Sequence, residues 1–287
     1  MMQAIDMPTA VITGATSGIG LVTARELART GMRVIALGRD KGRIKAVGQA
    51  ITEAVPGGRV EWILADFGSL EQVAQACAEI LETAGTIDML VNNAGNQLDR
   101  RITTGDGFEM TWQVNHLAPF LMTKLLLPRV LESPQPQVIT VSSIGHSMIP
   151  DMVWDDLQGE VAYSPYTAYF QSKLANVLFT RELAARNVST PLVASAVHPG
   201  LVASDFANKC DPAVQDYYAK AAASGEALTS EQGADTVIWL ATDHAQGRPS
   251  GGYFYQRERL DPSTAAMNPA SAERLWAISE EQVRAFA

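Results

Sequence analysis

The sequence predicts an α/β fold of the Rossmann type: a doubly wound parallel sheet of about seven strands with helices on both faces. Two observations lead to this prediction. Short apolar runs alternate with longer amphipathic runs along the chain, the order typical of parallel strands joined by right-handed helical crossovers. The short runs are apolar throughout and do not alternate with polar residues, as expected of strands that are buried on both faces.

The individual elements follow from the positions of these runs. The candidate strands are the apolar runs at residues 9–13, 33–37, 60–64, 87–91, 137–141, 192–197 and 253–255. The candidate helices are the amphipathic stretches at residues 18–30, 40–54, 69–84, 106–131 and 166–187. The 287 residues contain no repeat at a fixed period and no low-complexity tract, so we expect a single domain over residues 1–287.

Two segments interrupt this alternation, and we expect them to cover a substrate. Residues 144–165 are rich in proline, aspartate and glycine, and residues 201–228 carry a helical pattern with two tyrosines. Each segment follows the carboxyl end of a predicted strand, where open α/β sheets bind their ligands. The alternative is that both are ordinary surface excursions.

The composition argues against several classes of partner. The formal charge of −9, from 22 basic and 31 acidic residues, disfavours nucleic acid and anionic membranes, because both attract a basic surface. Cys77 and Cys210 share no metal-ligand spacing with the four histidines, so we expect neither a metal site nor a disulfide. Residues 1–8 show no leader sequence, and no apolar run is as long as a membrane span. We therefore expect a cytoplasmic protein without a membrane anchor.

A glycine-rich loop, TGATSGIG at residues 13–20, follows the first predicted strand and opens the first predicted helix. Gly14 permits the tight turn, Gly18 lets the backbone approach a pyrophosphate, and Gly20 allows the helix to pack closely on the sheet. The amino end of the helix offers free amides to a phosphate. The loop therefore predicts a dinucleotide site, and an ordinary glycine turn is the alternative.

The end of the second strand indicates which dinucleotide binds. NAD sites commonly have a carboxylate there for the ribose hydroxyls, whereas an arginine can pair with the additional phosphate of NADP. Here Gly38 stands at the position expected for the carboxylate, and Arg39 follows it. Asp40 is the next residue, and we expect it to cap the following helix. This pattern favours NADP over NAD.

Tyr169 and Lys173 are four residues apart in a predicted helix, so their side chains lie on the same face. A free tyrosine has a pKa of about 10, and a neighbouring cation lowers it by favouring the phenolate. The pair is therefore a candidate acid/base device, with the tyrosine exchanging a proton. The alternative is a solvated helix edge.

Taken in order, these motifs resemble those of the short-chain dehydrogenase/reductases over essentially the whole chain. Further matches are Asp66, the NNAG motif at residues 92–95, Asn115, Ser143 and the HPGLVAS segment at residues 198–204. The resemblance implies a catalytic tetrad of Asn115, Ser143, Tyr169 and Lys173. The cofactor contacts that it implies are Gly14, Ser17, Gly18, Ile19, Gly20, Arg39, Asp66, Phe67, Asn93, Ala94, Gly95, Tyr169, Lys173, Pro199, Gly200, Val202 and Ser204.

Within the family, the chain is most similar to the retinol dehydrogenase-like branch. The similarity rests on DGFEMTWQVNHL at residues 106–117, SSIGH at 142–146, WDDL at 154–157 and QSKLANVLF at 171–179. The chain lacks the membrane-anchoring segment of many vertebrate-type members, which weighs against a retinoid substrate. Ser204 stands where threonine is more usual and keeps the hydroxyl.

The resemblance also implies a role for each member of the tetrad. Tyr169 exchanges the proton, and Ser143 holds the carbonyl oxygen. Lys173 lowers the pKa of the tyrosine and binds the nicotinamide ribose, while Asn115 fixes a water behind the lysine. Ser142 is an alternative to Ser143. Tyr166 is an alternative to Tyr169, although it has Phe170 at its own fourth position.

The function expected from these residues is hydride transfer between NADP and a carbonyl or secondary alcohol of a moderately hydrophobic small molecule, with polycyclic and aromatic compounds as candidates. Two alternatives stand beside it. One is reduction of an activated carbon–carbon double bond, as in the related protochlorophyllide reductases. The other is a non-catalytic protein that senses NADP or binds a partner.

The remaining candidates concern the substrate and the assembly. We expect His146 and Tyr217 to contact substrate, and His116 and His198 to be structural. Trp112 and Tyr218 either line an apolar pocket or pack in the core. A homodimer or homotetramer is possible for this family, and residues 268–287 cover either their own subunit or a neighbouring one.

Overall fold

One sheet organises the part of the chain that the structure describes. The structure is a computed structural model and describes residues 7–243 and 248–287. The prediction that residues 1–8 hold no leader sequence falls mainly on residues 1–6, which lie outside the described ranges.

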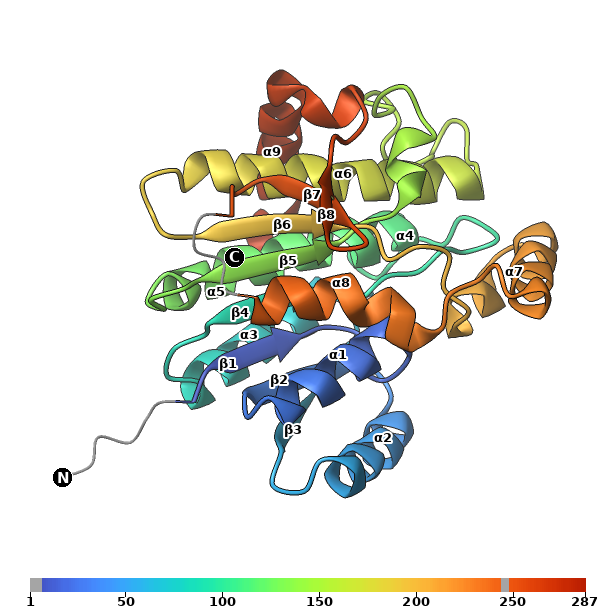
Figure 1. Cartoon of the computed structure of the whole chain (residues 1–287). Coiled ribbons are helices and arrows are strands. Elements are labelled where there is room, and N and C mark those ends of the chain that lie inside the picture. Colours follow the sequence, from blue (N-terminus) through green and yellow to red (C-terminus); the bar gives the residue numbers. More distant parts are fainter. Residues whose placement is uncertain (1–6, 244–247) are drawn as a thin grey trace.

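Within those ranges the sheet has eight strands in the order β3-β2-β1-β4-β5-β6-β7-β8 (Figure 1). The strands are β1 (Thr9–Ile12), β2 (Arg33–Gly38), β3 (Arg59–Leu64), β4 (Met89–Asn92), β5 (Gln137–Val141), β6 (Val193–Val197), β7 (Gly252–Tyr255) and β8 (Glu258–Leu260). Neighbours pair in parallel from β3 to β7, and β8 is antiparallel to β7. The chain order reverses between β1 and β4, so the loops after these strands diverge and leave a crevice.

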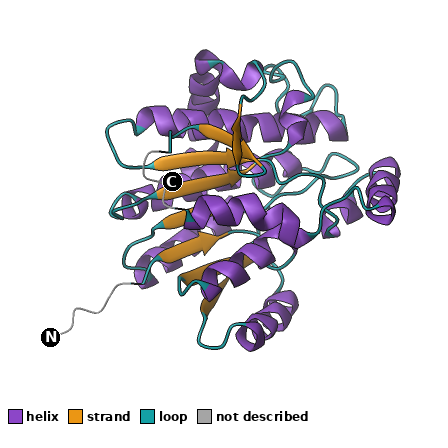
Figure 2. Ribbon diagram, in the orientation of Figure 1, coloured by secondary structure: helices purple, strands orange, loops and turns teal. Residues whose placement is uncertain are grey.

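Helices cover both faces of the sheet (Figure 2). They are α1 (Gly18–Arg29), α2 (Lys41–Ala54), α3 (Leu70–Thr83), α4 (Met110–Trp112), α5 (Ala118–Val130), α6 (Pro165–Arg186), α7 (Pro212–Ser224), α8 (Ser230–Thr242) and α9 (Pro269–Val283). The α1, α2 and α8 side chains share one apolar core with the strands, and those of α3, α5, α6 and α9 share a second. Along β1, Ala10 and Ile12 belong to the first core and Val11 to the second. The prediction of a doubly wound sheet is confirmed.

Several elements differ from the prediction, and α9 is one of them, because the predicted set contains no helix over residues 269–283. Strand β8, which is exposed along its length, brings the number of strands in the described sheet to eight. Helix α8 is missing from the predicted set, although its capping box, formed by Thr229 and Gln232, is a recognisable start signal. The helix predicted over residues 106–131 begins at Met110 and contains a π-helical turn, Gln113–Leu117, between α4 and α5.

Helix α9 packs on α6 of its own chain, which answers the question left open for residues 268–287. The Trp276 ring lies 5.0 Å from the Phe120 ring and 5.9 Å from the Phe179 ring, centroid to centroid. The Arg186 guanidinium lies 4.6 Å from the centroid of the Trp276 ring. Helix α9 thus covers an apolar face that α5 and α6 form together.

His116 ties α9 to the π-helical turn. Its Nε2 atom lies 2.7 Å from the Ser279 hydroxyl oxygen, and that hydroxyl donates to the Leu275 carbonyl at 2.8 Å, which leaves Nε2–H as the donor to Ser279. The histidine is 1% exposed, and burial lowers its pKa to about 3. His116 is therefore structural, as predicted.

This burial predicts how stability depends on pH. In the unfolded chain His116 takes up a proton below a pKa of about 6.5, whereas in the folded chain it stays neutral until about pH 3. Its contribution to the free energy of unfolding is therefore complete above pH 6.5 and is lost as the pH falls, by about 1.4 kcal/mol per pH unit. We expect His116→Gln to have a shallower decline between pH 6.5 and 5 in urea unfolding.

Ser279→Ala is the matched control, because it removes the same hydrogen bond but keeps the histidine. We expect Ser279→Ala to keep the slope of the parent protein. Equal slopes for His116→Gln and the parent would contradict a buried, neutral His116.

Candidate active site

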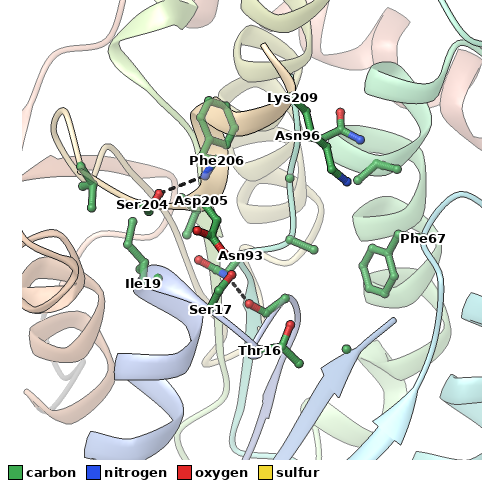
Figure 3. A pocket seen from close by; sticks show the side chains of 18 of the residues that line it. Thr16, Ser17, Ile19, Phe67, Asn93, Asn96, Ser204, Asp205, Phe206 and Lys209 are labelled. Atoms are coloured by element: carbon green, nitrogen blue, oxygen red, sulfur yellow. Dashed lines mark hydrogen bonds between the residues drawn. The ribbon is translucent and has the colours of Figure 1, made fainter. Parts of the chain in front are cut away.

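A cavity of about 480 Å³ lies at the carboxyl edge of the sheet. Its walls come from the loops after β1, β2, β3, β4, β5 and β6, together with α6 and the segment after β6. In Figure 3, Phe206 and Lys209 lie on one side of this pocket, and Thr16 and Ser17 lie on the other. The cavity includes the crevice predicted from the reversal of strand order between β1 and β4.

Most of the residues predicted to bind the cofactor line this cavity. They are Gly14, Ser17, Gly18, Ile19, Arg39, Asp66, Phe67, Asn93, Ala94, Gly95, Tyr169, Lys173, Pro199, Gly200, Val202 and Ser204. Gly20 does not line the cavity, in keeping with its predicted packing role. Ser143 lines it as well, so the structure brings three members of the predicted tetrad into the same space.

The glycine loop is fixed to the loop that follows β4. The Thr13 hydroxyl oxygen accepts hydrogen bonds from the backbone amides of Asn93 at 2.9 Å and Ala94 at 3.0 Å. Gly14 has a φ of +65°, and a Cβ atom on it would lie 2.9 Å from the Ala94 Cα atom. A Cβ on Gly20 would overlap the Asn93 side-chain nitrogen and the Gly14 carbonyl oxygen. These two glycines are therefore required for the loops to approach each other.

The amino end of α1 suits an anion. Ser17 occupies the N-cap position, but its side chain accepts no hydrogen bond from the first turn. That turn holds no acidic residue, so its amides are open to the cavity and the helix dipole is not neutralised there. These features fit the pyrophosphate of a dinucleotide.

At the end of β2 the structure favours a cation over a carboxylate. A Cβ on Gly38 would overlap the methyl group of Thr16, so an acidic side chain has no room at that position. Asp40 caps α2, because its Oδ1 atom accepts a hydrogen bond from the Arg43 amide at 2.8 Å, and this prediction is confirmed. Arg39, Arg43 and Asp40 all border the cavity.

Tyr169 and Lys173 point from α6 into the cavity. The Lys173 ammonium nitrogen lies 5.6 Å from the centroid of the Tyr169 ring and donates to the Val141 carbonyl at 3.1 Å. Tyr166 is 41% exposed and does not line the cavity, which favours Tyr169 as the reactive tyrosine. The hydroxyl of Ser142 donates to the Lys173 carbonyl at 2.8 Å, so Ser142 holds α6 in place.

Burial dominates the titration of this pair. It raises the pKa of the Tyr169 phenol well above its usual value, with a smaller opposing contribution from the Ser143 hydroxyl. The pKa of Lys173 falls to about 8, also because of burial. Lys173 is not among the groups that shift the pKa of Tyr169, so the lowering of that pKa by the lysine stays a prediction.

Asn115 lies in the π-helical turn and is fully buried. Its side-chain amide donates to the Asn96 carbonyl at 2.8 Å and to the Ser172 hydroxyl at 2.9 Å. Its oxygen accepts from the Asn96 amide at 2.7 Å. The point where a Cβ on Gly95 would sit lies 3.3 Å from this oxygen and 3.4 Å from the Lys173 nitrogen. Asn115 and Lys173 therefore face one small space behind the cavity, which exists because residue 95 is glycine.

The predicted substrate contacts need correction. The Nδ1 atom of His146 donates to the Ser143 carbonyl at 2.8 Å, and Nε2 accepts from the Ser263 amide at 3.1 Å. With both nitrogens occupied and its side chain away from the cavity, His146 is structural. Tyr217 is 52% exposed and points away, whereas its neighbour Tyr218 lines the cavity.

The other aromatic and histidine candidates pack in the interior. Trp112 is fully buried, and its indole nitrogen donates to Gln282 at 3.1 Å. The Nδ1 atom of His198 accepts from the Ile144 amide at 3.3 Å and the Gly200 amide at 3.2 Å. Burial lowers the pKa of His198 to about 4, so it stays neutral and structural.

Phe206 is one of several cavity residues that were not among the predicted contacts. Phe206 lies in η3 (Asp205–Lys209), a short 3₁₀ helix after β6, and its ring lies 5.5 Å from that of Tyr169. Tyr218 stands 6.3 Å from Phe206 on its other side. Together these three rings form an aromatic wall beside the Tyr169 hydroxyl, and the segment 201–228 supplies two of them.

Comparison with known proteins identifies the family. The model of a family described as short chain dehydrogenase matches residues 8–215. The chain belongs to this family. It is therefore an NAD(P)-dependent dehydrogenase/reductase.

The relatives of this short-chain dehydrogenase also support the retinol dehydrogenase-like branch. Retinol dehydrogenase 12 of Mus musculus is 38% identical over 94% of this chain and 84% of its own length. Retinol dehydrogenase 14 of Homo sapiens is 37% identical over 96% and 86%. Polyprenol dehydrogenase of Homo sapiens is 35% identical over 95% and 84%.

Solved structures agree with the fold of this short-chain dehydrogenase. A crystal structure of an uncharacterised protein from Mycobacterium Paratuberculosis has a TM-score of 0.75 and 34% identity, covering 98% of this chain and 97% of that one. A protein from Beutenbergia cavernae, described as an NAD(P) dependent gluconate 5-dehydrogenase, was solved with bound NADP. Its TM-score is 0.66 and its identity 27%, covering 87% of this chain and 95% of that one.

Neither a membrane-spanning helix nor a metal-binding cluster is found in the described ranges. No helix among residues 7–243 and 248–287 has both the length and the apolar character needed to cross a bilayer. In the same ranges, no group of three or more histidine, cysteine or acidic side chains is arranged to hold a metal ion.

The approach of the two loops predicts the effect of adding one methyl group. Gly20→Ala places a Cβ where Asn93 and the Gly14 carbonyl already stand, so the loops must separate. We expect a loss of about 1–3 kcal/mol in the free energy of unfolding and weaker dinucleotide binding by calorimetric titration. Gly85→Ala is the control, because a Cβ there meets nothing within 4 Å; equal effects of the two variants would rule out the steric account.

Proposed function

We propose that this chain is an NADP-dependent oxidoreductase that interconverts a carbonyl and a secondary alcohol on a moderately hydrophobic small molecule. One observation carries the proposal: Tyr169, Ser143 and Lys173 line the same cavity as the glycine loop and the arginines at the end of β2. A proton donor, an oxyanion partner and a dinucleotide cradle are thus available together.

Tyr169 and Ser143 act on the oxygen of the substrate. In the direction of reduction, the Tyr169 hydroxyl gives its proton to the carbonyl oxygen while the bound nicotinamide supplies hydride to the carbonyl carbon. The Ser143 hydroxyl donates a hydrogen bond to the same oxygen and stabilises the charge that develops there. In the direction of oxidation the tyrosine removes the proton instead.

The charge of Lys173 offsets part of the energetic cost of forming a phenolate at the buried Tyr169. A phenolate in this cavity is costly, since burial raises the pKa of Tyr169. The pKa of Lys173 is about 8, so its ammonium still carries a charge at neutral pH and can stabilise the phenolate. Asn115 and Lys173 face one small space beside Gly95, and we assign to it the water through which the proton is replenished.

The choice of NADP rests on the end of β2. Gly38 leaves no room for a carboxylate, and Arg39 and Arg43 border the cavity beside it. Guanidinium groups bind phosphate by charge-assisted hydrogen bonds. The glycine loop and the α1 amides would hold the pyrophosphate, and Asp66 and Phe67 would contact the adenine.

The aromatic wall supports a hydrophobic substrate. Phe206 and Tyr218 present apolar ring faces next to Tyr169. The relatives named for retinol and for polyprenol are consistent with a hydrophobic alcohol or its carbonyl. A cytoplasmic location remains a prediction, as does association into dimers or tetramers.

Removing the Tyr169 hydroxyl tests the acid/base assignment. We expect Tyr169→Phe to lower kcat by about 100- to 10,000-fold and to leave the Kd of NADPH unchanged, because only the proton donor is lost. Tyr166→Phe is the matched control and should keep the parent activity, since that tyrosine lies outside the cavity. The assay is NADPH consumption with a panel of carbonyl compounds, followed by identification of the product.

Each outcome has a meaning. Reduction at the parent rate by Tyr169→Phe would refute the acid/base role. A product reduced at a carbon–carbon double bond would favour the alternative reductase chemistry. Tight NADPH binding without turnover of any compound would favour a cofactor-sensing protein.

Removing the Arg39 guanidinium tests the cofactor preference. We expect Arg39→Ala to raise the Kd of NADPH by about ten- to a hundred-fold, the size of a charged hydrogen bond, and to change the Kd of NADH little. Arg284→Ala, which removes an exposed arginine outside the cavity, should change neither value. Equal losses for both nucleotides in Arg39→Ala would contradict the NADP assignment.

A further inference from the structure

The short helix η3 contacts both ends of the cavity. Near one end, Phe206 packs 5.5 Å from the ring of Tyr169. At the other, Lys209 lines the cavity together with Arg39 and Arg43. Asp205 links the same helix to α2, since its carboxylate lies 3.2 Å from the Arg43 guanidinium. Five consecutive residues therefore connect the catalytic tyrosine with the cations near β2.

These cations come from three separate elements of the chain. Arg39 follows β2, Arg43 lies in α2 and Lys209 ends η3. Burial lowers the pKa of Lys209, and the charges of Arg39 and then Arg43 add to this effect, whereas the nearby Asp66 carboxylate opposes it. Like charges that converge on a cavity raise the energy of the free protein and favour an anion with more than one charge.

Figure 3 shows the part of this pocket that η3 forms. The side chains of Asp205, Phe206 and Lys209 are drawn on the same side of the pocket, across from Thr16. Thr16 belongs to the glycine loop and its methyl group fills the space beside Gly38. Lys209 therefore lines the cavity from the segment that covers the substrate half.

We propose that η3 senses which dinucleotide is bound: Lys209 is a third ligand of the phosphate that distinguishes NADP from NAD, and this contact holds Phe206 against Tyr169. The proposal rests on the proposed NADP preference and extends it to the substrate-covering segment. Because residues 205–209 form one helical unit, Lys209 and Phe206 are held or released together. NADH lacks that phosphate, so the charged link between η3 and α2 in its complex is the exposed Asp205–Arg43 pair, a weak tether.

The test compares two nucleotides on the full chain and three variants. The variants are Lys209→Met, Lys209→Arg and Lys220→Met. The control, Lys220, lies on the adjoining α7, is 76% exposed and stays outside the cavity. Calorimetric titration gives the Kd of NADPH and of NADH, and hydrogen exchange gives the protection of residues 204–211 in each complex.

We expect Lys209→Met to raise the Kd of NADPH by about ten-fold, as for one partly exposed charged hydrogen bond, and to leave that of NADH unchanged. Lys209→Arg should restore most of the affinity, and Lys220→Met should behave as the parent. In the parent, NADPH should protect residues 204–211 more than NADH does. In Lys209→Met that difference should vanish.

Two results would overturn the proposal: equal changes in both affinities in Lys209→Met, or equal protection of residues 204–211 by both nucleotides in the parent. If Arg39→Ala weakens NADPH binding more than NADH binding while Lys209→Met does not, only the role of η3 is lost. If neither substitution weakens NADPH binding more than NADH binding, the NADP preference itself is wrong.

Discussion

The site depends on one buried hydroxyl, that of Thr13, at the point where the strand order reverses between β1 and β4. Past β1 and β4 the chain leaves toward opposite faces, so the backbone amides at the start of the second loop lose the partners that a strand ladder would provide. The Thr13 hydroxyl oxygen accepts hydrogen bonds from two of these amides. The Asn93 side-chain amide in turn donates a hydrogen bond to the Thr13 carbonyl at 2.9 Å. Glycines keep this junction free of side chains. The floor of the cavity, the amino end of α1 and the wall beside Lys173 all take their positions from it.

A second network of hydrogen bonds fixes α6 and the buried Lys173 side chain beside the cavity. Ser142 and Asn115 hydrogen-bond to α6 on either side of Lys173, and Lys173 bonds to the Val141 carbonyl at the end of β5. The bonds from Ser142 and Asn115 hold the helix, and the bond to Val141 holds the buried ammonium itself. In this low-dielectric setting, the stabilisation that it gives a phenolate on Tyr169 is larger than a surface lysine provides.

The sequence predicted those parts of the structure that depend on local pattern. Periodicity, spacing and motif order predicted the parallel strands, the glycine loop, the Asp40 cap and the helix that carries Tyr169. The remaining features depend on which way a side chain faces after tertiary packing. Tyr217 and Tyr218 are adjacent on α7, and only the docking of that helix decides that Tyr218 faces the cavity. His146 follows Ser143 closely in the chain, yet the 3₁₀ turn after β5 points its ring toward Ser263. The π-helical turn at Asn115 also has no local signature, because it arises where α5 must pack against both β4 and α6.

The packing of α9 has a consequence for biosynthesis. Phe120 and Phe179 are synthesised well before Trp276, and they belong to helices that flank the active site. Until α9 emerges from the ribosome, their apolar face is open to water and to other nascent chains. The covering contact is therefore a long-range one, and a chain that has not yet formed it exposes an apolar face of the kind that favours aggregation.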